Sequence, residues 1–438
     1  MKTRRELIKR WSECSGPMSI SNVSDPYVRE NLAVLLNNQE SKDMNGNQIF
    51  MEANDGTINT TNLDASNINW RFRPVALALM RRTFPDLFAN KTVGVQAMNT
   101  PVGLSYALRF TYDKTGTGQE AAWDAPDYHG GYTGSPGTSA ALAQIFGSGA
   151  LSAQNAGIYD TSGTGLATSA GEALQIFEGC MPGACSGQPE WKQLGLRIDR
   201  TAIEAESRKI ATSFSLEAAQ DIKAMHGVEI EREMVNVLQY EITAELDRQL
   251  LYRMKLASVN VANGGASITS INCATGGDID GRWSGEKYMN IVASIIHQAN
   301  VIATSTRRGP GNFVIVSPAI ASCLQAAGHQ FVQYDSKVNP TTVLASIGRL
   351  NGSIEVYRDQ YARADYALVG YKGPGVSDAG IIFSPYIMGL QNRAISPDDF
   401  SPRIGVMSRY AITDSLLGSG RYYRLLSFYN VNQIIAGA

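Results

Sequence analysis

The most informative absence in this 438-residue chain is positive charge between Lys114 and Lys192, where neither lysine nor arginine occurs. The same stretch is rich in Gly, Ser, Thr and Ala. A connection of this length without structure of its own is uncommon inside a compact domain. Trp123, Tyr128 and Phe146 can contribute to a small core. The sequence therefore predicts a small inserted domain at about 114–192, and one long loop is the alternative.

Charge is scarce over the whole chain as well. Charged residues make up 18% of the sequence, below the usual quarter, and the formal net charge is −2. General nucleic-acid binding needs a basic surface, and this charge balance does not indicate one. The 44% hydrophobic content is that of a globular protein. A low charge fraction suits a protein that buries much of its surface against copies of itself.

Targeting and membrane signals are also missing. No uninterrupted apolar run is long enough to span a membrane. The first residues, MKTRRELIKRWSE, are charged and no apolar segment follows them, so we expect no signal peptide.

Residues that commonly carry chemistry are few. The five cysteines are scattered, which favours a reducing compartment over a disulfide framework. Cys180 and Cys185 form either a local disulfide or two ordinary thiols. The four histidines are not spaced as i, i+4 metal ligands, and no phosphate-binding glycine loop or Gly-x-Ser-x-Gly motif occurs. We therefore expect no catalytic site, no metal and no cofactor.

One acidic pair remains as a candidate. Glu204 and Glu206 lie two residues apart, so on a strand they share a face, and Arg208 falls on the same face. The pair can serve acid–base catalysis, whereas the three charges together favour salt bridges between subunits. An enzyme that uses Glu204 and Glu206, or the Cys180–Cys185 loop, is the alternative from a different functional class.

The pattern of elements predicts an α+β or α/β fold. Residues 1–52 form a separate, mostly helical and polar segment in which Asp25 and Pro26 mark a helix start. Thr92 to Tyr112 predicts two strands, with Leu104, Tyr106, Leu108 and Phe110 on one face of the second. Further along, helices at 288–302 and 318–327 alternate with strands at 312–317, 354–357, 366–371 and 379–383.

The stretch from Ser207 to Gly227 predicts a strand that leads into a helix capped by Ser215. An apolar stripe continues through Leu250, which makes a helical rod of about 40 residues, or about 60 Å if straight. Gly227 interrupts the stripe, and we interpret it as a kink within the rod and not as the end of a helix.

Several short segments, taken together and in order, resemble the major capsid proteins of T-even-type tailed phages, which have the HK97-like fold. They cover most of residues 70–410 and include RRTFPDL (81–87), VGVQAM (93–98), LRID (196–199), IEAESR (203–208), LEAAQD (216–221), RWSGE (282–286), GNFVI (311–315), DQY (359–361), GYKGP (370–374) and DAG (378–380). One such segment is weak evidence, but the ordered set is specific.

This resemblance implies an α+β, HK97-like subunit with a defined domain order. The implied parts are an N-terminal scaffold-like segment (1–52), an N-terminal arm and start of the peripheral domain (53–99), an extended loop (100–212) that carries the inserted domain, a spine helix and peripheral domain (213–300), an axial domain (301–400) and a return to the peripheral domain (401–438).

The resemblance also implies function and partners. The chain is expected to build hexameric capsomers of an icosahedral virion shell that encloses phage DNA, after assembly in the host cytoplasm. The alternative is the pentameric capsid vertex protein of the same family. Expected partners are other copies of the chain, vertex pentamers, decoration proteins, scaffold, prohead protease and portal, without sequence-specific nucleic acid or membrane. A prohead protease is expected to cut between Glu52 and Ala53, and Glu204, Glu206 and Arg208 are expected to contact neighbouring subunits.

Overall fold

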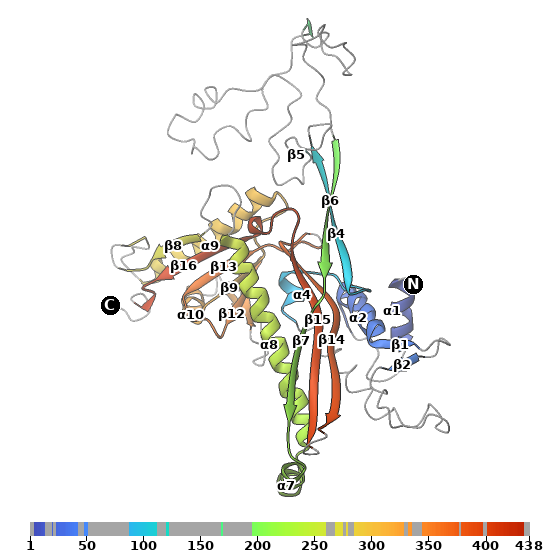
Figure 1. The fold of residues 1–438 in the computed structure, drawn as a ribbon. Helices are drawn as coiled ribbons and strands as arrows, with labels where there is room; N and C mark the ends of the chain where they lie inside the picture. Colours follow the sequence, from blue (N-terminus) through green and yellow to red (C-terminus); the bar gives the residue numbers. More distant parts are fainter. Residues whose placement is uncertain are drawn as a thin grey trace. The chain divides into compact units, whose positions relative to one another are not determined.

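A computed structural model describes residues 4–13, 20, 23–42, 48–50, 87–111, 120–121, 168–169, 195–259, 268–274, 277–278, 284–327, 332–334, 344–375, 378–396 and 401–432. The chain divides into two compact units. The larger unit contains Met1–Ser105, Ala202–Thr304 and Gly309–Ala438, and the smaller contains Tyr106–Thr201 with Ser305–Arg308. Helices and strands both contribute to the larger unit, which makes the fold α+β (Figure 1).

A seven-stranded sheet forms one part of the larger unit, with strand order β10-β11-β12-β9-β13-β16-β8. Its strands are β8 (Ile268–Asn272), β9 (Phe313–Val316), β10 (Val332–Tyr334), β11 (Leu344–Leu350), β12 (Ile354–Asp359), β13 (Tyr366–Gly370) and β16 (Tyr423–Tyr429). All four residues of β9 and all five of β13 are buried, as expected for central strands covered on both faces. Helices α9 (Ser284–Thr306) and α10 (Pro318–Ala326) share the same core through Ile295 and Leu324.

A four-stranded sheet forms the second part, in the order β3-β14-β15-β7. It contains β3 (Gly94–Val95), β7 (Glu206–Ser213) and the long antiparallel hairpin β14 (Ile381–Ile395) and β15 (Pro402–Asp414). Helix α8 (Ile230–Val259) lies along this sheet, where Val235, Leu238 and Ile242 pack against Ile404 and Val406 (Figure 1).

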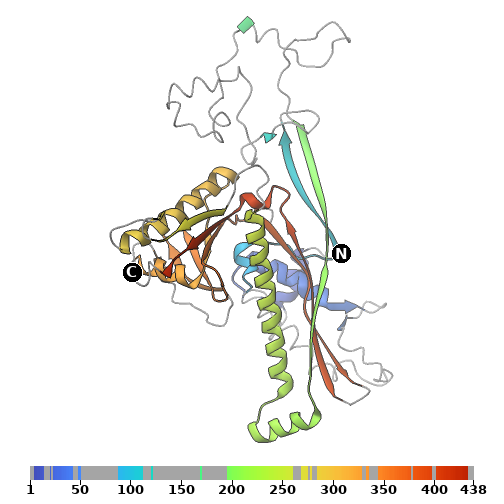
Figure 2. The same cartoon turned by 60° about the vertical axis from the view of Figure 1, so that its left-hand side comes forward.

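The predicted helix start at Ser215 is confirmed, but the single 40-residue rod is wrong. Helix α7 (Leu216–His226) begins after Ser215, whose side chain accepts a hydrogen bond from the Ala218 amide at 3.2 Å. Gly227 has φ of 68°, in the left-handed region that glycine adopts readily, and its amide donates to Lys223 O. This geometry ends a helix. Helix α8 then starts anew at Ile230, and α7 turns away from its axis (Figure 2).

The N-terminal segment is helical as predicted, but it is not separate. Helices α1 (Arg4–Glu13) and α2 (Pro26–Gln39) join the main hydrophobic core of the larger unit. The Asp25 carboxylate accepts a hydrogen bond from the Tyr27 amide at 3.0 Å, which confirms the predicted helix start. A short hairpin, β1 (Glu40–Lys42) and β2 (Gln48–Phe50), follows α2. In the described part of this segment, burial is concentrated in α2, where six consecutive residues, 31–36, are buried.

Three further strands form the sheet β5-β4-β6. They are β4 (Val102–Thr111), β5 (Glu120–Ala121) and β6 (Gly195–Glu204). Most of the predicted insertion at 114–192 lies outside the described residues. The described part of the larger unit also contains a four-residue helix, α4 (Ala89–Thr92), and the 3-10 turn η2 (Ser419–Arg421).

The two large sheets do not follow the expected boundaries at 300 and 400. Strands β8 and β16, from the regions expected to be peripheral, belong to the seven-stranded sheet, while β14 belongs to the four-stranded one. The division into axial and peripheral domains therefore stays a prediction. Among the described helices, none is both long and apolar enough to cross a lipid bilayer.

Candidate interaction surfaces

Arg208 is held by its own chain. It lies on β7, where its guanidinium forms an ion pair with Glu245 of α8 and donates a hydrogen bond to Gln249 Oε1 at 2.9 Å. The same guanidinium lies 5.9 Å from the ring centroid of Tyr410, whose hydroxyl also donates to Gln249 Oε1, at 2.7 Å. This network joins α8 to the four-stranded sheet, so Arg208 has a structural role within the subunit.

Glu204 and Glu206 lie on different strands. Ala205 separates the end of β6 from the start of β7, and its amide bonds to Pro101 O at 2.9 Å. Both carboxylate side chains are exposed. The contact of Glu204, Glu206 and Arg208 with a neighbouring subunit stays a prediction. The sequence had no signal for the pairing of Arg208 with α8.

The thiols that can be described do not suit nucleophilic chemistry. Cys273 and Cys323 are free and buried, and burial raises the pKa of each thiol to about 11. A thiol with such a pKa is protonated at neutral pH, and the thiolate is the reactive form. Cys180, Cys185 and the expected cleavage pair Glu52 and Ala53 lie outside the described residues. Within those residues, no group of three or more His, Cys, Asp or Glu side chains can hold a metal ion.

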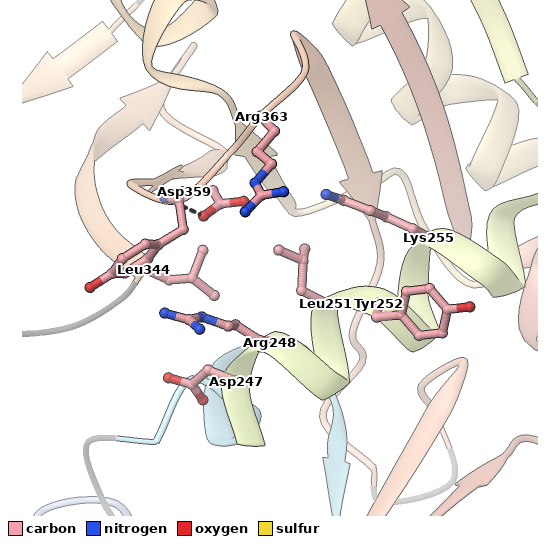
Figure 3. Close-up of a pocket in the computed structure, with 9 residues that line it drawn as sticks. Asp247, Arg248, Leu251, Tyr252, Lys255, Leu344, Asp359 and Arg363 are labelled. Carbon is pink, nitrogen blue, oxygen red and sulfur yellow. Dashed lines mark hydrogen bonds between the residues drawn. The ribbon is translucent and has the colours of Figure 1, made fainter. Parts of the chain in front are cut away.

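A cavity of about 340 Å³ lies where α8 meets the seven-stranded sheet (Figure 3). Its walls are formed by Asp247, Arg248, Leu251, Tyr252, Lys255, Leu344, Asp359, Tyr361 and Arg363. The Arg248 guanidinium stacks 4.4 Å from the Tyr361 ring centroid, and the Lys255 ammonium lies 3.6 Å from that of Tyr366. Both contacts are cation–π interactions that tie the helix to the sheet.

The two carboxylates of the cavity serve structural roles. Asp359 accepts hydrogen bonds from the Tyr361 amide at 3.0 Å and from the Tyr366 hydroxyl at 2.6 Å. Asp247 is 4% exposed, and desolvation raises its pKa to about 7, partly opposed by a hydrogen bond from the Phe88 backbone. Its Oδ1 atom has no hydrogen-bond partner. The cavity therefore contains polar contacts between α8 and the sheet, together with one buried carboxylate oxygen, Asp247 Oδ1, that has no hydrogen-bond partner.

The predicted apolar face of β4 is confirmed, and it faces solvent. Tyr106, Leu108 and Phe110 are 58%, 54% and 39% exposed, while the residues between them are half-buried. Leu196 and Ile198 of β6 are exposed as well. Soluble monomers rarely present contiguous apolar surface, and such surface usually marks a contact with another protein. The smaller unit thus carries a surface, which we call the β4 apolar face (Tyr106, Leu108, Phe110), that is suited to a partner.

Helix α7 shows a related feature, because none of its residues is buried. Leu216 and Met225 are both more than half exposed. An isolated helix of this length is only marginally stable in water and usually needs a packing partner. The sequence predicted the helix but not its exposure.

Comparison with known proteins identifies the family of this chain. The profile of the family "Major capsid protein Gp23" matches residues 69–425. The major capsid protein of Enterobacteria phage T6 is 30% identical over 489 aligned positions, which cover 94% of this chain and 95% of the relative. The capsid vertex protein of Vibrio phage KVP40 is 27% identical, over 51% of this chain and 70% of the relative.

The solved capsid of Myoviridae phage XM1 aligns over 78% of this chain and 91% of its own, at 9% identity and a TM-score of 0.39, a value too low to bear on the fold. The profile match and the T6 relative each span most of the chain. The chain belongs to the major capsid protein Gp23 family.

Proposed function

We propose that this chain is the structural subunit that forms the hexameric capsomers of a T4-like phage head, an icosahedral shell around the phage DNA. The observation that carries the proposal is the family match over residues 69–425. The β4 apolar face supports it, because a shell subunit needs apolar surface that only a neighbouring copy can cover.

The hexamer role is favoured over the pentamer role by coverage. The T6 major capsid protein aligns with 94% of this chain, whereas the KVP40 vertex protein aligns with 51%. Pentamers of the vertex protein are then proposed as partners of this chain in the same shell. Scaffold, prohead protease, portal and decoration proteins are further proposed partners, with assembly in the host cytoplasm and a final location in the virion.

The HK97-like arrangement gives each part a proposed role. Helix α8 is the spine helix, the seven-stranded sheet is the core of the axial domain, and the four-stranded sheet with α8 belongs to the peripheral domain. Strands β4 and β6 form the stem of the extended loop. Glu204 and Glu206, both exposed, are proposed to contact a neighbouring copy together with Arg208, and Glu52–Ala53 is the proposed cleavage site.

The proposal is tested by electron microscopy of the purified protein under assembly conditions. Six-fold capsomers, tubes or shells are expected, five-fold capsomers alone would support the vertex role, and a strictly monomeric protein would refute both. Leu108→Asp should abolish assembly, because it places a charge in the β4 apolar face, while far-UV circular dichroism stays unchanged. Leu108→Met is the matched control and should assemble, since it keeps the apolar area. Assembly of Leu108→Asp at the parent level would remove the β4 face from the interface.

A further inference from the structure

The middle of helix α2 is enclosed on all sides. Six consecutive residues, from Asn31 to Leu36, are buried, although consecutive positions on a helix point in different directions. Val28 is buried as well, and these side chains belong to the same core as Leu87, Val93 and Val95. A helix that is merely laid on a surface buries one stripe only. The burial of α2 is that of an internal element of the core.

Helix α1 covers the outer side of α2. Leu7 and Trp11 of α1 are buried in the shared core. Arg4 forms an ion pair with Glu30 at 2.9 Å, between two partly exposed side chains. The two helices therefore form one unit in which α1 shields α2 from solvent.

Helix α2 also closes an open sheet edge. Strand β3 is an edge strand of its sheet. In the segment from Val95 to Met98, the backbone groups point alternately toward β14 and away from it. The amides of Gln96 and Met98 point to β14, where they bond to Phe383 O and Pro385 O, both at 2.9 Å. The intervening groups, Val95 O and Ala97 N, face away from β14 and need other partners.

Two side chains of α2 supply these partners: the Tyr27 hydroxyl donates to Val95 O, and Asn31 bonds to both groups. Asn31 donates from Nδ2 to Val95 O at 3.2 Å and accepts from the Ala97 amide at Oδ1, also at 3.2 Å. One amide side chain thus takes the place of a neighbouring strand. Asn38, two helical turns later, donates from Nδ2 to Met98 O at 2.7 Å and to Tyr386 O at 3.0 Å. We call Asn31 and Asn38 the asparagine clamp.

We propose that the edge formed by Val95–Met98 and Tyr386 is a binding site for a helix with asparagines seven residues apart, and that α2 stays bound there after the chain is cut downstream of it. Breaking one peptide bond beyond Phe50 removes none of the buried contacts or clamp hydrogen bonds. Removal of the N-terminal segment is therefore a two-step event, in which cleavage and displacement are separate. The inference follows from the contacts of α2 and applies to any cut downstream of this helix.

The test uses the full chain with a recognition sequence for a site-specific protease inserted after Asn54 and an affinity tag at the C-terminus. After cleavage the protein is captured by its tag, washed in native buffer, and the co-retained N-terminal fragment is measured by mass spectrometry. Near-stoichiometric retention is expected, with release only in denaturant. Loss of the fragment in native buffer on cleavage would overturn the proposal.

Variants then assign retention to the clamp. The double substitution Asn31→Ala with Asn38→Ala should speed fragment dissociation by at least about tenfold, because four hydrogen bonds to buried or half-buried backbone groups are lost. Glu30→Gln is the matched control on the same helix, because its side chain contacts α1 and should leave retention near the parent level. Equal retention in the clamp variant and the control would show that the asparagines do not hold the helix. If the double variant does not fold before cleavage, the experiment on the parent chain still tests retention, and the single substitution Asn38→Ala tests the clamp. Retention does not depend on shell formation, so its failure is distinct from failure to assemble.

Discussion

Replacing Asp247 by asparagine tests whether the burial of this carboxyl makes the free energy of unfolding depend on pH. In the folded protein burial raises the pKa of this carboxyl to about 7, from 3.8 in its ordinary state. Between these values the unfolded chain loses its proton while the folded chain keeps it, so the free energy of unfolding falls as pH rises through this window. At 1.36 kcal/mol per pKa unit the fall approaches about 4 kcal/mol by neutral pH, which is an upper bound.

Asp247→Asn removes this pH dependence, since the amide does not ionise. It keeps an oxygen to accept from the Phe88 backbone, but its NH2 group replaces an atom without a partner, which costs about 1–3 kcal/mol. The variant should thus be neutral or less stable than the parent near about pH 4, and should become relatively more stable toward about pH 8. Urea unfolding of unassembled protein, followed by tryptophan fluorescence across this range, measures the difference. A stability difference that does not change with pH would refute the raised pKa.

Two further substitutions test local structure. Ser215→Ala removes the side chain that caps α7 and should destabilise that exposed helix by about 1 kcal/mol, seen as faster amide hydrogen exchange within α7; Ser213→Ala, at the end of β7, should leave the exchange unchanged. Gly370→Ala places a methyl group against the ring of Phe313 in the centre of the seven-stranded sheet and should lower the free energy of unfolding by about 1–3 kcal/mol. Gly352→Ala cannot serve as its control, because Gly352 has φ of 72° and a side chain there would itself strain the backbone. An unchanged melting temperature for Gly370→Ala would contradict the packing described for that strand.

Local patterns in the sequence predicted the elements that local chemistry determines. The strand expected at 312–317 contains β9, Pro318 begins α10, and the helix expected at 288–302 lies within α9. Such elements depend on periodicity and capping within a few residues. The long β14–β15 hairpin was not predicted beyond its first residues, because its register depends on pairing with β7 from a distant part of the chain.

The prediction of the candidate site was limited in the same way, because it considered only residues that are close in sequence. Proximity along the chain grouped Glu204, Glu206 and Arg208, and an extended backbone would place them on one face. In the structure, Ala205 separates Glu204 and Glu206 onto different strands. Arg208 donates a hydrogen bond to Gln249, which lies 41 residues further along the chain, on α8. The partner of a charged residue on a strand depends on which helix covers that strand. Tertiary packing determines that helix, and the spacing of residues in the sequence does not reveal it.

Gly227 illustrates how one backbone angle decides between two structures with the same apolar pattern. A kink within a continuous helix keeps right-handed φ values on both sides and leaves α7 and α8 nearly coaxial. The observed φ of 68° instead closes α7 and lets the chain change direction before Ile230. Because α7 then leaves the line of α8, its apolar residues lose the sheet that covers Val235 and Leu238 and become exposed. The same glycine that ends the helix thereby creates a surface free to contact another copy of the chain in a shell.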